Sequence, residues 1–164
     1  MAEDLPELAG RLANALQRRR ESLATAESCT GGWVAKICTD MVGSSAWFER
    51  GFVTYSNASK QELLGVSADT LERYGAVSEQ TVQEMATGVL KNSHAQWALA
   101  ISGLAGPGGG SREKPVGTVC FAWAGPRGWL TSRRCRFDGD RDAVRRQSVA
   151  TSLSVLTAHI DELA

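Results

Sequence analysis

The feature that most constrains the fold is the alternation of two apolar spacings along the chain. Near the start, leucines recur every three or four residues and predict a helix: Leu5, Leu8, Leu12 and Leu16. The short apolar run 22–26 then predicts a buried strand. A second helical pattern follows it, with one face formed by Val34, Ile37, Cys38, Met41 and Val42. Helices that alternate with strands are typical of α/β folds.

The middle of the chain continues this alternation. Strands are predicted at 47–55 and 97–102, where apolar residues run without a helical spacing. A short helix is predicted at 58–64, and a longer one begins after Ser78, which is a suitable N-cap. These segments extend the α/β pattern beyond the first hundred residues.

The last third of the chain predicts a hairpin and a long helix. The segments 116–124 and 129–137 flank a Gly-Pro-Arg-Gly turn and pair plausibly as antiparallel strands. Asp140 is expected to cap a final helix, whose apolar stripe comprises Val149, Leu153, Leu156, Ile160 and Leu163. We therefore expect residues 1–164 to form one domain, an α/β/α sandwich with a mixed, mostly parallel sheet.

Composition excludes several classes of protein. With 43% hydrophobic and 22% charged residues, the chain is neither disordered nor collagen-like. Basic and acidic residues both number 18, so no overall field attracts the chain to nucleic acid or membrane. The acidic start is unlike a signal peptide, and no apolar run reaches the roughly 20 residues of a membrane helix. Four cysteines without a CxxC pair complete the expectation of a cytoplasmic protein with reduced thiols.

The turn after the first predicted strand is the first candidate site. Ser28 stands where a buried strand leads into a helix, next to the free amides of the helix start. The amides of Thr30, Gly31 and Gly32 could stabilise an oxyanion there. In the alternative interpretation Ser28 or Thr30 only caps the helix. Cys29 is a second candidate nucleophile, because a helix N-terminus lowers the pKa of a thiol.

A serine nucleophile needs a base, and histidine is scarce. The chain contains only His94 and His159, and neither lies beside a candidate nucleophile. Lys60 follows the strand that ends near Tyr55, but its pKa of about 10.4 would have to fall by about 3 units for it to act at neutral pH. A solvated surface lysine is the alternative. No metal-binding motif is present, so no metal is expected.

Two further segments indicate ligand binding. The glycine-rich stretch 102–111 follows a strand, where open α/β sheets bind ligands, but it matches neither a P-loop nor a dinucleotide motif. Arg141, Arg145 and Arg146 lie at the start of the last predicted helix. Positive side chains oppose the helix dipole there, which favours a bound anion. A solvated face of Asp–Arg pairs is the alternative.

Several short motifs together resemble one family. In chain order they are 26–32 (AESCTGG), 43–45 (GSS), 52–57 (FVTYSN), 75–78 (GAVS), 102–107 (SGLAGP), 114–119 (KPVGTV) and 139–141 (GDR). From about residue 5 to the C-terminus, the chain resembles the CinA C-terminal domain family, and specifically its stand-alone nicotinamide mononucleotide amidohydrolases. The resemblance implies hydrolysis of the nucleotide's carboxamide to nicotinic acid mononucleotide and ammonia, without a cofactor.

The resemblance also implies residue roles. Ser28 would be the nucleophile, Lys60 the general base and Tyr55 a relay or positioning hydroxyl. By the same analogy we assign three groups of substrate contacts: the amides of Thr30, Gly31 and Gly32 for the tetrahedral intermediate, Ser102, Gly103 and Gly106 for the pyridine–ribose pocket, and Arg141 and Arg145 for the 5′-phosphate.

Two other functions remain open at this point. The chain could be a non-catalytic nucleotide-binding or competence-related interaction protein, since the family is associated with competence and DNA damage. A DNA-binding module built on the arginines is disfavoured by zero net charge and by the lack of interleaved aromatic residues. We expect a homo-oligomer, a dimer or higher, in which tryptophans either form the interface or fill the core: Trp33, Trp47, Trp97, Trp123 and Trp129.

Overall fold

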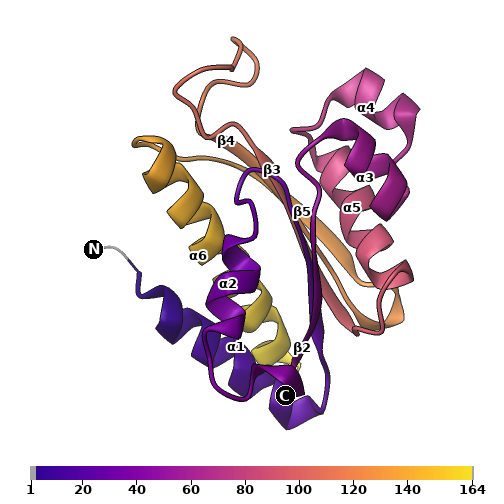
Figure 1. The fold of residues 1–164 in the computed structure, drawn as a ribbon, viewed down its shortest axis with the longest axis vertical. Coiled ribbons are helices and arrows are strands. Elements are labelled where there is room, and N and C mark those ends of the chain that lie inside the picture. Colours follow the sequence, from indigo (N-terminus) through magenta and orange to yellow (C-terminus); the bar gives the residue numbers. More distant parts are fainter. Residues whose placement is uncertain (1–2, 164) are drawn as a thin grey trace.

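A computed structural model describes residues 3–163 of the protein. The fold has three layers, a β-sheet with helices on both faces (Figure 1). In chain order the elements are α1 (Leu5–Arg19), β1 (Leu23–Glu27), α2 (Trp33–Thr39), a 3₁₀ turn (Ser44–Ala46), β2 (Phe48–Val53), α3 (Asn57–Leu64), α4 (Ala68–Tyr74), α5 (Glu79–Lys91), β3 (Trp97–Gly103), β4 (Thr118–Ala124), a 3₁₀ turn (Pro126–Gly128), β5 (Leu130–Arg136) and α6 (Arg141–Glu162). Helices α1, α2 and α6 cover one face of the sheet, and α3, α4 and α5 lie on the other.

The sheet is mixed, in the order β2-β1-β3-β4-β5. Strands β2, β1 and β3 are parallel, and the hairpin strands β4 and β5 are antiparallel neighbours. Four of the five strands therefore point the same way, which confirms the expected α/β/α sandwich. The carboxyl ends of β1 and β3 lie side by side, because Glu27 pairs with Ile101. Open sheets of this kind bind ligands at that edge.

The two faces of the sheet carry different cores. The face under α1, α2 and α6 is built from large residues such as Leu12, Phe121 and Leu153. The strands present mainly alanine to α5: Ala24, Ala26, Ala98, Ala100, Ala122 and Ala124. Because alanine is short, α5 lies close to the sheet. Gly88 then brings α3 against α5, since a Cβ at that position would lie only 2.0 Å from the carbonyl oxygen of Leu64.

The structure corrects three local expectations. Helix α2 ends at Thr39, and the chain then turns through Gly43 at φ 83°, so Val42 is fully exposed and does not join the apolar face. Leu163 lies beyond α6 and is exposed, because the helix ends at Glu162. Helix α4 was not predicted.

The tryptophans belong mainly to the core. Trp47, Trp97 and Trp123 are buried in the larger core, and Trp33 and Trp129 are partly buried and pack against it. Of the two alternatives that the sequence left open for them, filling the core is therefore the one that the first three adopt. The predicted caps Ser78 and Asp140 are confirmed, since each side chain accepts a hydrogen bond from an amide in the first helical turn.

Candidate active site

Ser28 lies at the carboxyl end of the central part of the sheet. It follows β1 directly, and its amide donates to the carbonyl of Ile101 on β3 (3.0 Å). Its side chain is 8% exposed and points to the side of the sheet that carries α3. The first candidate nucleophile is therefore held by strand pairing and is nearly enclosed.

Lys60 meets Ser28 from α3. Its side chain is 1% exposed, and its Nζ lies 3.0 Å from Ser28 Oγ. The same Nζ donates to the carbonyl oxygens of Thr54 (2.7 Å) and Tyr55 (3.4 Å). Burial lowers the pKa of Lys60, against an opposing influence of Cys29 that raises it. The interpretation of Lys60 as a solvated surface lysine is wrong.

The contacts of Lys60 also orient it as a base. The two carbonyls can only accept hydrogen bonds, whereas the Ser28 hydroxyl can donate one. A neutral amine has two hydrogens and one lone pair. With its hydrogens on Thr54 and Tyr55, the lone pair is left for the proton of Ser28. This arrangement can deprotonate a serine when a substrate carbonyl is present.

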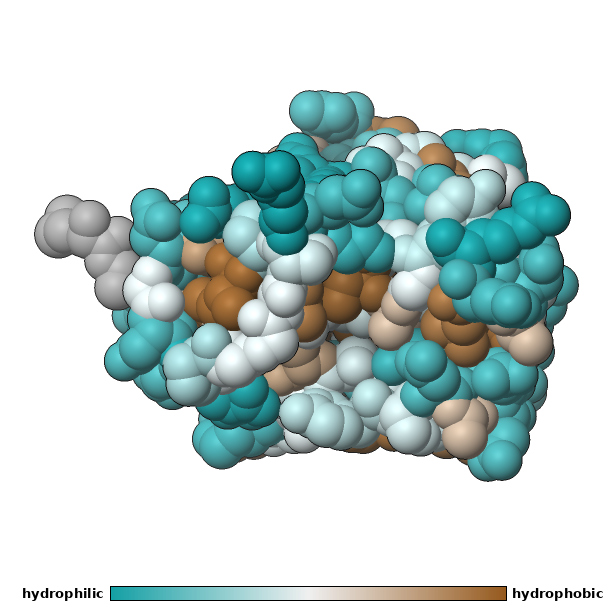
Figure 2. All heavy atoms as spheres, turned by 90° about the horizontal axis from the view of Figure 1, so that it is seen from above, coloured by the Kyte–Doolittle hydropathy of each residue, from teal (hydrophilic) through white to brown (hydrophobic). Residues whose placement is uncertain are grey.

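The dyad opens into a pocket of about 260 Å³. The lining residues are Ser28, Cys29, Tyr55, Lys60, Ala76, Val77, Ser102, Gly103, Leu104, Ala105 and Arg141. The polar groups gather near Ser28, and small apolar side chains form the remaining wall. Seen from the end of the molecule at the top of Figure 1, the surface is mainly hydrophilic and encloses smaller hydrophobic patches (Figure 2). Small-molecule sites commonly combine an apolar wall with a few polar groups in this way.

Arg141 and Tyr55 stand at the mouth of this pocket. The guanidinium of Arg141 donates to the carbonyl of Gly106 (2.9 Å) and to the hydroxyl of Tyr55 (3.3 Å). The Tyr55 side chain is 64% exposed. Its hydroxyl thus contacts Arg141, and only its backbone carbonyl contacts Lys60. Gly106 has φ 80°, and a Cβ there would lie 2.4 Å from a methyl group of Val116, so the loop requires glycine.

Five of the predicted site residues do not line this pocket: Gly106, in the loop just described, and four others. Thr30, Gly31, Gly32 and Arg145 line a neighbouring, open hollow of about 510 Å³ together with Trp33 and Lys36. The amide of Gly31 already donates to the carbonyl of Ser28 (3.0 Å). Arg145 donates to the carbonyls of Cys29 (3.0 Å) and Thr30 (3.2 Å). The structure places these groups behind the Ser28 loop.

Glu27 is a buried charged residue next to Ser28 that no prediction from the sequence singled out. Its carboxylate accepts hydrogen bonds from the Thr30 hydroxyl (2.6 Å) and from the amides of Val34 (2.8 Å) and Ala35 (3.1 Å). It thereby caps α2, a role that was considered for Ser28 and Thr30. The available signal was an acidic residue shortly before a helix start, where the dipole favours negative charge.

The surroundings of Cys29 disfavour its thiolate form, contrary to the effect expected of a helix N-terminus. Burial, and next to it the negative charge of Glu27, raises the pKa of its thiol to about 12. A thiol with that pKa is protonated at neutral pH and is a poor nucleophile.

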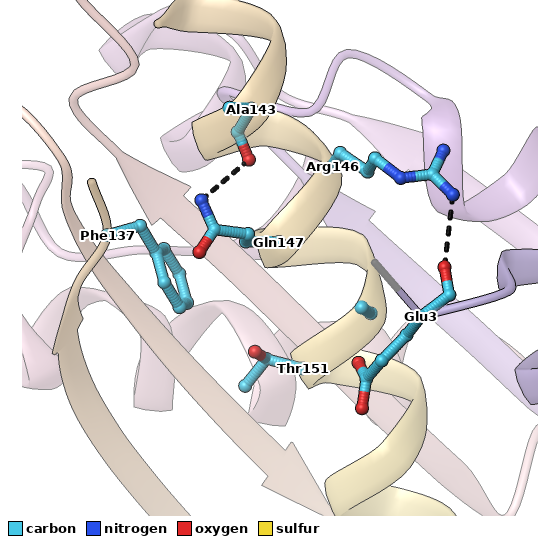
Figure 3. Close-up of a pocket in the computed structure, with 7 residues that line it drawn as sticks. Glu3, Phe137, Ala143, Arg146, Gln147 and Thr151 are labelled. Carbon is cyan, nitrogen blue, oxygen red and sulfur yellow. Dashed lines mark hydrogen bonds between the residues drawn. The ribbon is translucent and has the colours of Figure 1, made fainter. Parts of the chain in front are cut away.

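A larger pocket, of about 510 Å³, lies between the N-terminal segment and α6 (Figure 3). Its lining is Glu3, Phe137, Ala143, Arg146, Gln147, Ala150 and Thr151. Arg146 reaches across to the carbonyl of Glu3 (3.0 Å), and Gln147 donates to the carbonyl of Ala143 (3.0 Å). Both of these bonds end on backbone carbonyls, and among residues 3–163 no hydrogen bond in this cavity joins a nucleophile to a base as Lys60 joins Ser28. Within residues 3–163, no three His, Cys, Asp or Glu side chains gather as a metal site. Over the same residues, no helix has the length and apolarity needed to cross a membrane.

Comparison with known proteins assigns this chain to a family. The CinA C-terminal domain model matches residues 5–160. The chain is 58% identical over 153 residues to the nicotinamide-nucleotide amidohydrolase PncC of Escherichia coli K12, covering 93% of both chains. A Pseudomonas putida protein of the same name is 52% identical, covering 91% of this chain and 92% of that one.

Solved structures agree. The competence/damage inducible protein CihA from Agrobacterium tumefaciens has a TM-score of 0.92 at 44% identity, covering 96% of this chain and 97% of that one. A CinA superfamily protein from Klebsiella pneumoniae has a TM-score of 0.93 at 43% identity, covering 98% and 99%. With a family model, full-length relatives and solved structures in agreement, this chain belongs to the CinA C-terminal domain family.

Proposed function

We propose that this chain is an amidase that hydrolyses the carboxamide of nicotinamide mononucleotide, giving nicotinic acid mononucleotide and ammonia. The observation that carries the proposal is the buried contact between Lys60 Nζ and Ser28 Oγ, at 3.0 Å, inside a pocket of about 260 Å³. The names of the relatives described above, at 58% and 52% identity over nearly the whole chain, support the same reaction.

In the first half of the reaction Ser28 attacks the carboxamide carbon. Lys60 accepts the hydroxyl proton as the bond between Ser28 Oγ and the carbon forms. The protonated amine then donates this proton to the amide nitrogen, because ammonia leaves only when the nitrogen is protonated. The result is an acyl-enzyme and free ammonia. In the second half water attacks the acyl carbon and gives a proton to Lys60. The bond between that carbon and Ser28 Oγ then breaks, Lys60 returns the proton to Oγ, and the carboxylate is released.

The tetrahedral intermediate needs hydrogen-bond donors. Our expectation named the amides of Thr30, Gly31 and Gly32. Because the Gly31 amide donates to the carbonyl of Ser28, it is committed in the resting protein. We propose the Thr30 amide as the remaining donor of this group nearest to Ser28. In a planar trans peptide it points opposite to the Cys29 carbonyl, which faces Arg145 behind the loop.

The rest of the substrate extends toward the mouth of the pocket. We propose that Ser102 and Gly103, which line the pocket, contact the pyridine and ribose, while Gly106 shapes the loop beside them. The 5′-phosphate is assigned to Arg141, whose guanidinium stands at the mouth. Tyr55 is proposed to position Arg141, since its hydroxyl contacts that guanidinium. Remote phosphate binding of this kind can be used to orient the reacting carboxamide.

We also propose that residues 1–164 act as one domain, without a cofactor or metal, as a homo-oligomer in the cytoplasm and without a nucleic-acid partner. Equal numbers of basic and acidic residues, 18 each, support the last point. Light scattering of the purified protein measures its mass and thus tests the assembly.

The test of the reaction is ammonia release from nicotinamide mononucleotide by purified protein, with chelator present and with Ser28→Ala in parallel. We expect release by the wild type alone, and binding of the nucleotide by both proteins. Release by Ser28→Ala would refute the serine mechanism. A folded wild-type protein that binds the nucleotide without releasing ammonia would favour the non-catalytic alternative.

A further inference from the structure

The loop that carries Ser28 is held from one side by a buried carboxylate. Glu27 is 1% exposed, and both of its oxygens accept hydrogen bonds. One oxygen takes the Thr30 hydroxyl (2.6 Å) and the Val34 amide (2.8 Å), and the other takes the Ala35 amide (3.1 Å). All three donors come from the segment that follows Ser28, so the carboxylate ties that segment to the end of β1.

A buried carboxylate is costly unless its oxygens are satisfied, so this arrangement is strongly specified by its partners. Glu27 also reaches the other half of the dyad through its backbone. Its carbonyl accepts from the amide of Thr54 (2.9 Å), and the carbonyl of Thr54 accepts from Lys60 Nζ (2.7 Å). One residue thus contacts the segments that present both Ser28 and Lys60.

The same loop is also held by a guanidinium, which binds its carbonyls. Arg145, on α6, donates from Nε to the carbonyl of Cys29 (3.0 Å) and from Nη2 to that of Thr30 (3.2 Å). Its carbon Cζ lies 5.5 Å from the centroid of the Trp33 ring, which supports the side chain in this orientation. Two of its three nitrogens are therefore committed to the loop.

The hydrogen-bond donors of this segment thus bind the negative carboxylate of Glu27, and its carbonyl oxygens bind the positive guanidinium of Arg145. We propose that Glu27 and Arg145 form a clamp that positions Ser28 for attack, so that Glu27 and Arg145 are positioning residues for the amidase. The inference rests on the proposed function. On this proposal a change at Arg145 lowers kcat. The interpretation from the sequence made Arg145 a phosphate ligand, so that the same change would instead raise KM.

Conservative variants with matched controls separate these roles. Thr30→Val removes one of the three bonds to Glu27 and keeps the shape of the side chain. Its control is Thr39→Val, at the end of α2, where the hydroxyl bonds only to carbonyls of its own helix. Arg145→Lys keeps the charge but loses the two-nitrogen contact. Its control is Arg134→Lys on β5, an exposed arginine that also donates to a backbone carbonyl, that of Glu113. Glu27→Gln is the stronger change, and Thr30→Val covers the case in which it does not fold.

Two assays are needed. The first is steady-state turnover of nicotinamide mononucleotide and of nicotinamide riboside, which lacks the phosphate. The second is the rate at which a fluorophosphonate probe labels Ser28, measured by intact mass, which requires no amide substrate. Thermal midpoints identify variants that have merely lost stability.

We expect Glu27→Gln to lower kcat by about 100-fold, the loss associated with a misplacement of about 1 Å, and Thr30→Val and Arg145→Lys by about 10-fold. KM stays unchanged, both substrates are affected equally, and Ser28 labelling slows in parallel, while both controls match the wild type. The clamp is refuted if Thr30→Val keeps wild-type kcat and labelling, or if Arg145→Lys raises KM for the phosphorylated substrate alone. If the wild type releases no ammonia, but Ser28 is still labelled more slowly in the variants than in the wild type, the proposed function is refuted and the clamp stands.

Discussion

Gly88 offers a sharp test of how the fold positions the base. Helix α3, which carries Lys60, packs against α5 where Gly88 has no side chain. A Cβ built on Gly88 lies 2.0 Å from the carbonyl oxygen of Leu64, and side-chain carbons essentially never approach an atom closer than 3.0 Å. Gly88→Ala must therefore displace the end of α3 by at least 1.0 Å.

The displacement can be followed to the dyad. Lys60 lies one helical turn before Leu64, so it moves with this end of α3. The contact of 3.0 Å between Lys60 Nζ and Ser28 Oγ then lengthens to about 4 Å, beyond hydrogen-bond distance. A misplacement of about 1 Å lowers a rate by about 100-fold, so kcat should fall by that order. Stability changes less, because overpacking costs about 1–3 kcal/mol and the gain in helix propensity offsets about 1 kcal/mol.

The assay is ammonia release together with thermal unfolding. Gly10→Ala is the matched control: Gly10 is also inside a helix, but its added Cβ would lie 3.8 Å from Met41 Cε, an ordinary contact. We expect this control to keep wild-type kcat and to gain up to about 1 kcal/mol of stability. If Gly88→Ala also keeps wild-type kcat, the packing of α3 on α5 does not set the position of Lys60, and the reasoning is wrong.

Three further predictions follow from the same site. Lys60 must be neutral to act as base, and burial lowers its pKa. The value of kcat should therefore stay high below the ordinary lysine pKa of 10.5 and fall as the pH drops through the lowered pKa. A pH profile of kcat without this fall on the acid side would contradict the role of Lys60. Arg141→Ala should raise KM for the nucleotide far more than for nicotinamide riboside, and equal losses would argue against phosphate binding at the pocket mouth. Cys29→Ala should retain most activity, because burial raises the thiol pKa to about 12; complete inactivation in a folded variant would reopen Cys29 as nucleophile.

The α/β/α architecture could be predicted because apolar spacing is strong in most elements. Helix α4 was missed because it buries one apolar side chain, Leu71, which gives no periodic pattern. Its capping signals were nevertheless present, with Ser67 accepting from the Thr70 amide and Gly75 at the C-cap. Val42 was assigned to a buried face because its spacing continues the helical pattern. That spacing does not reveal that α2 ends at Thr39, before Val42 is reached.

Ser28 and Lys60 were singled out as candidates by their positions in the sequence, but their pairing as nucleophile and base came from the resemblance. Lys60 lies in a polar helix, but it is buried once α3 packs on α5 at Gly88 and Nζ meets the carbonyls of Thr54 and Tyr55. Arginines at the start of α6 were interpreted as anion ligands. Arg145 instead donates to backbone carbonyls, because a loop from the other end of the chain lies there. Such partners are separated by more than a hundred residues, and no local pattern encodes them.

The contact between Arg145 and Thr30 has a consequence for synthesis, since it joins residues 115 positions apart. During translation the Ser28 loop emerges more than a hundred residues before the guanidinium that holds it. A nascent chain therefore has its nucleophile long before it has the means to fix it. Hydrolytic activity should appear only once α6 has docked, which makes turnover a direct report of completed folding. A two-fragment version, divided in the loop before Asp140, would be silent until its halves are mixed.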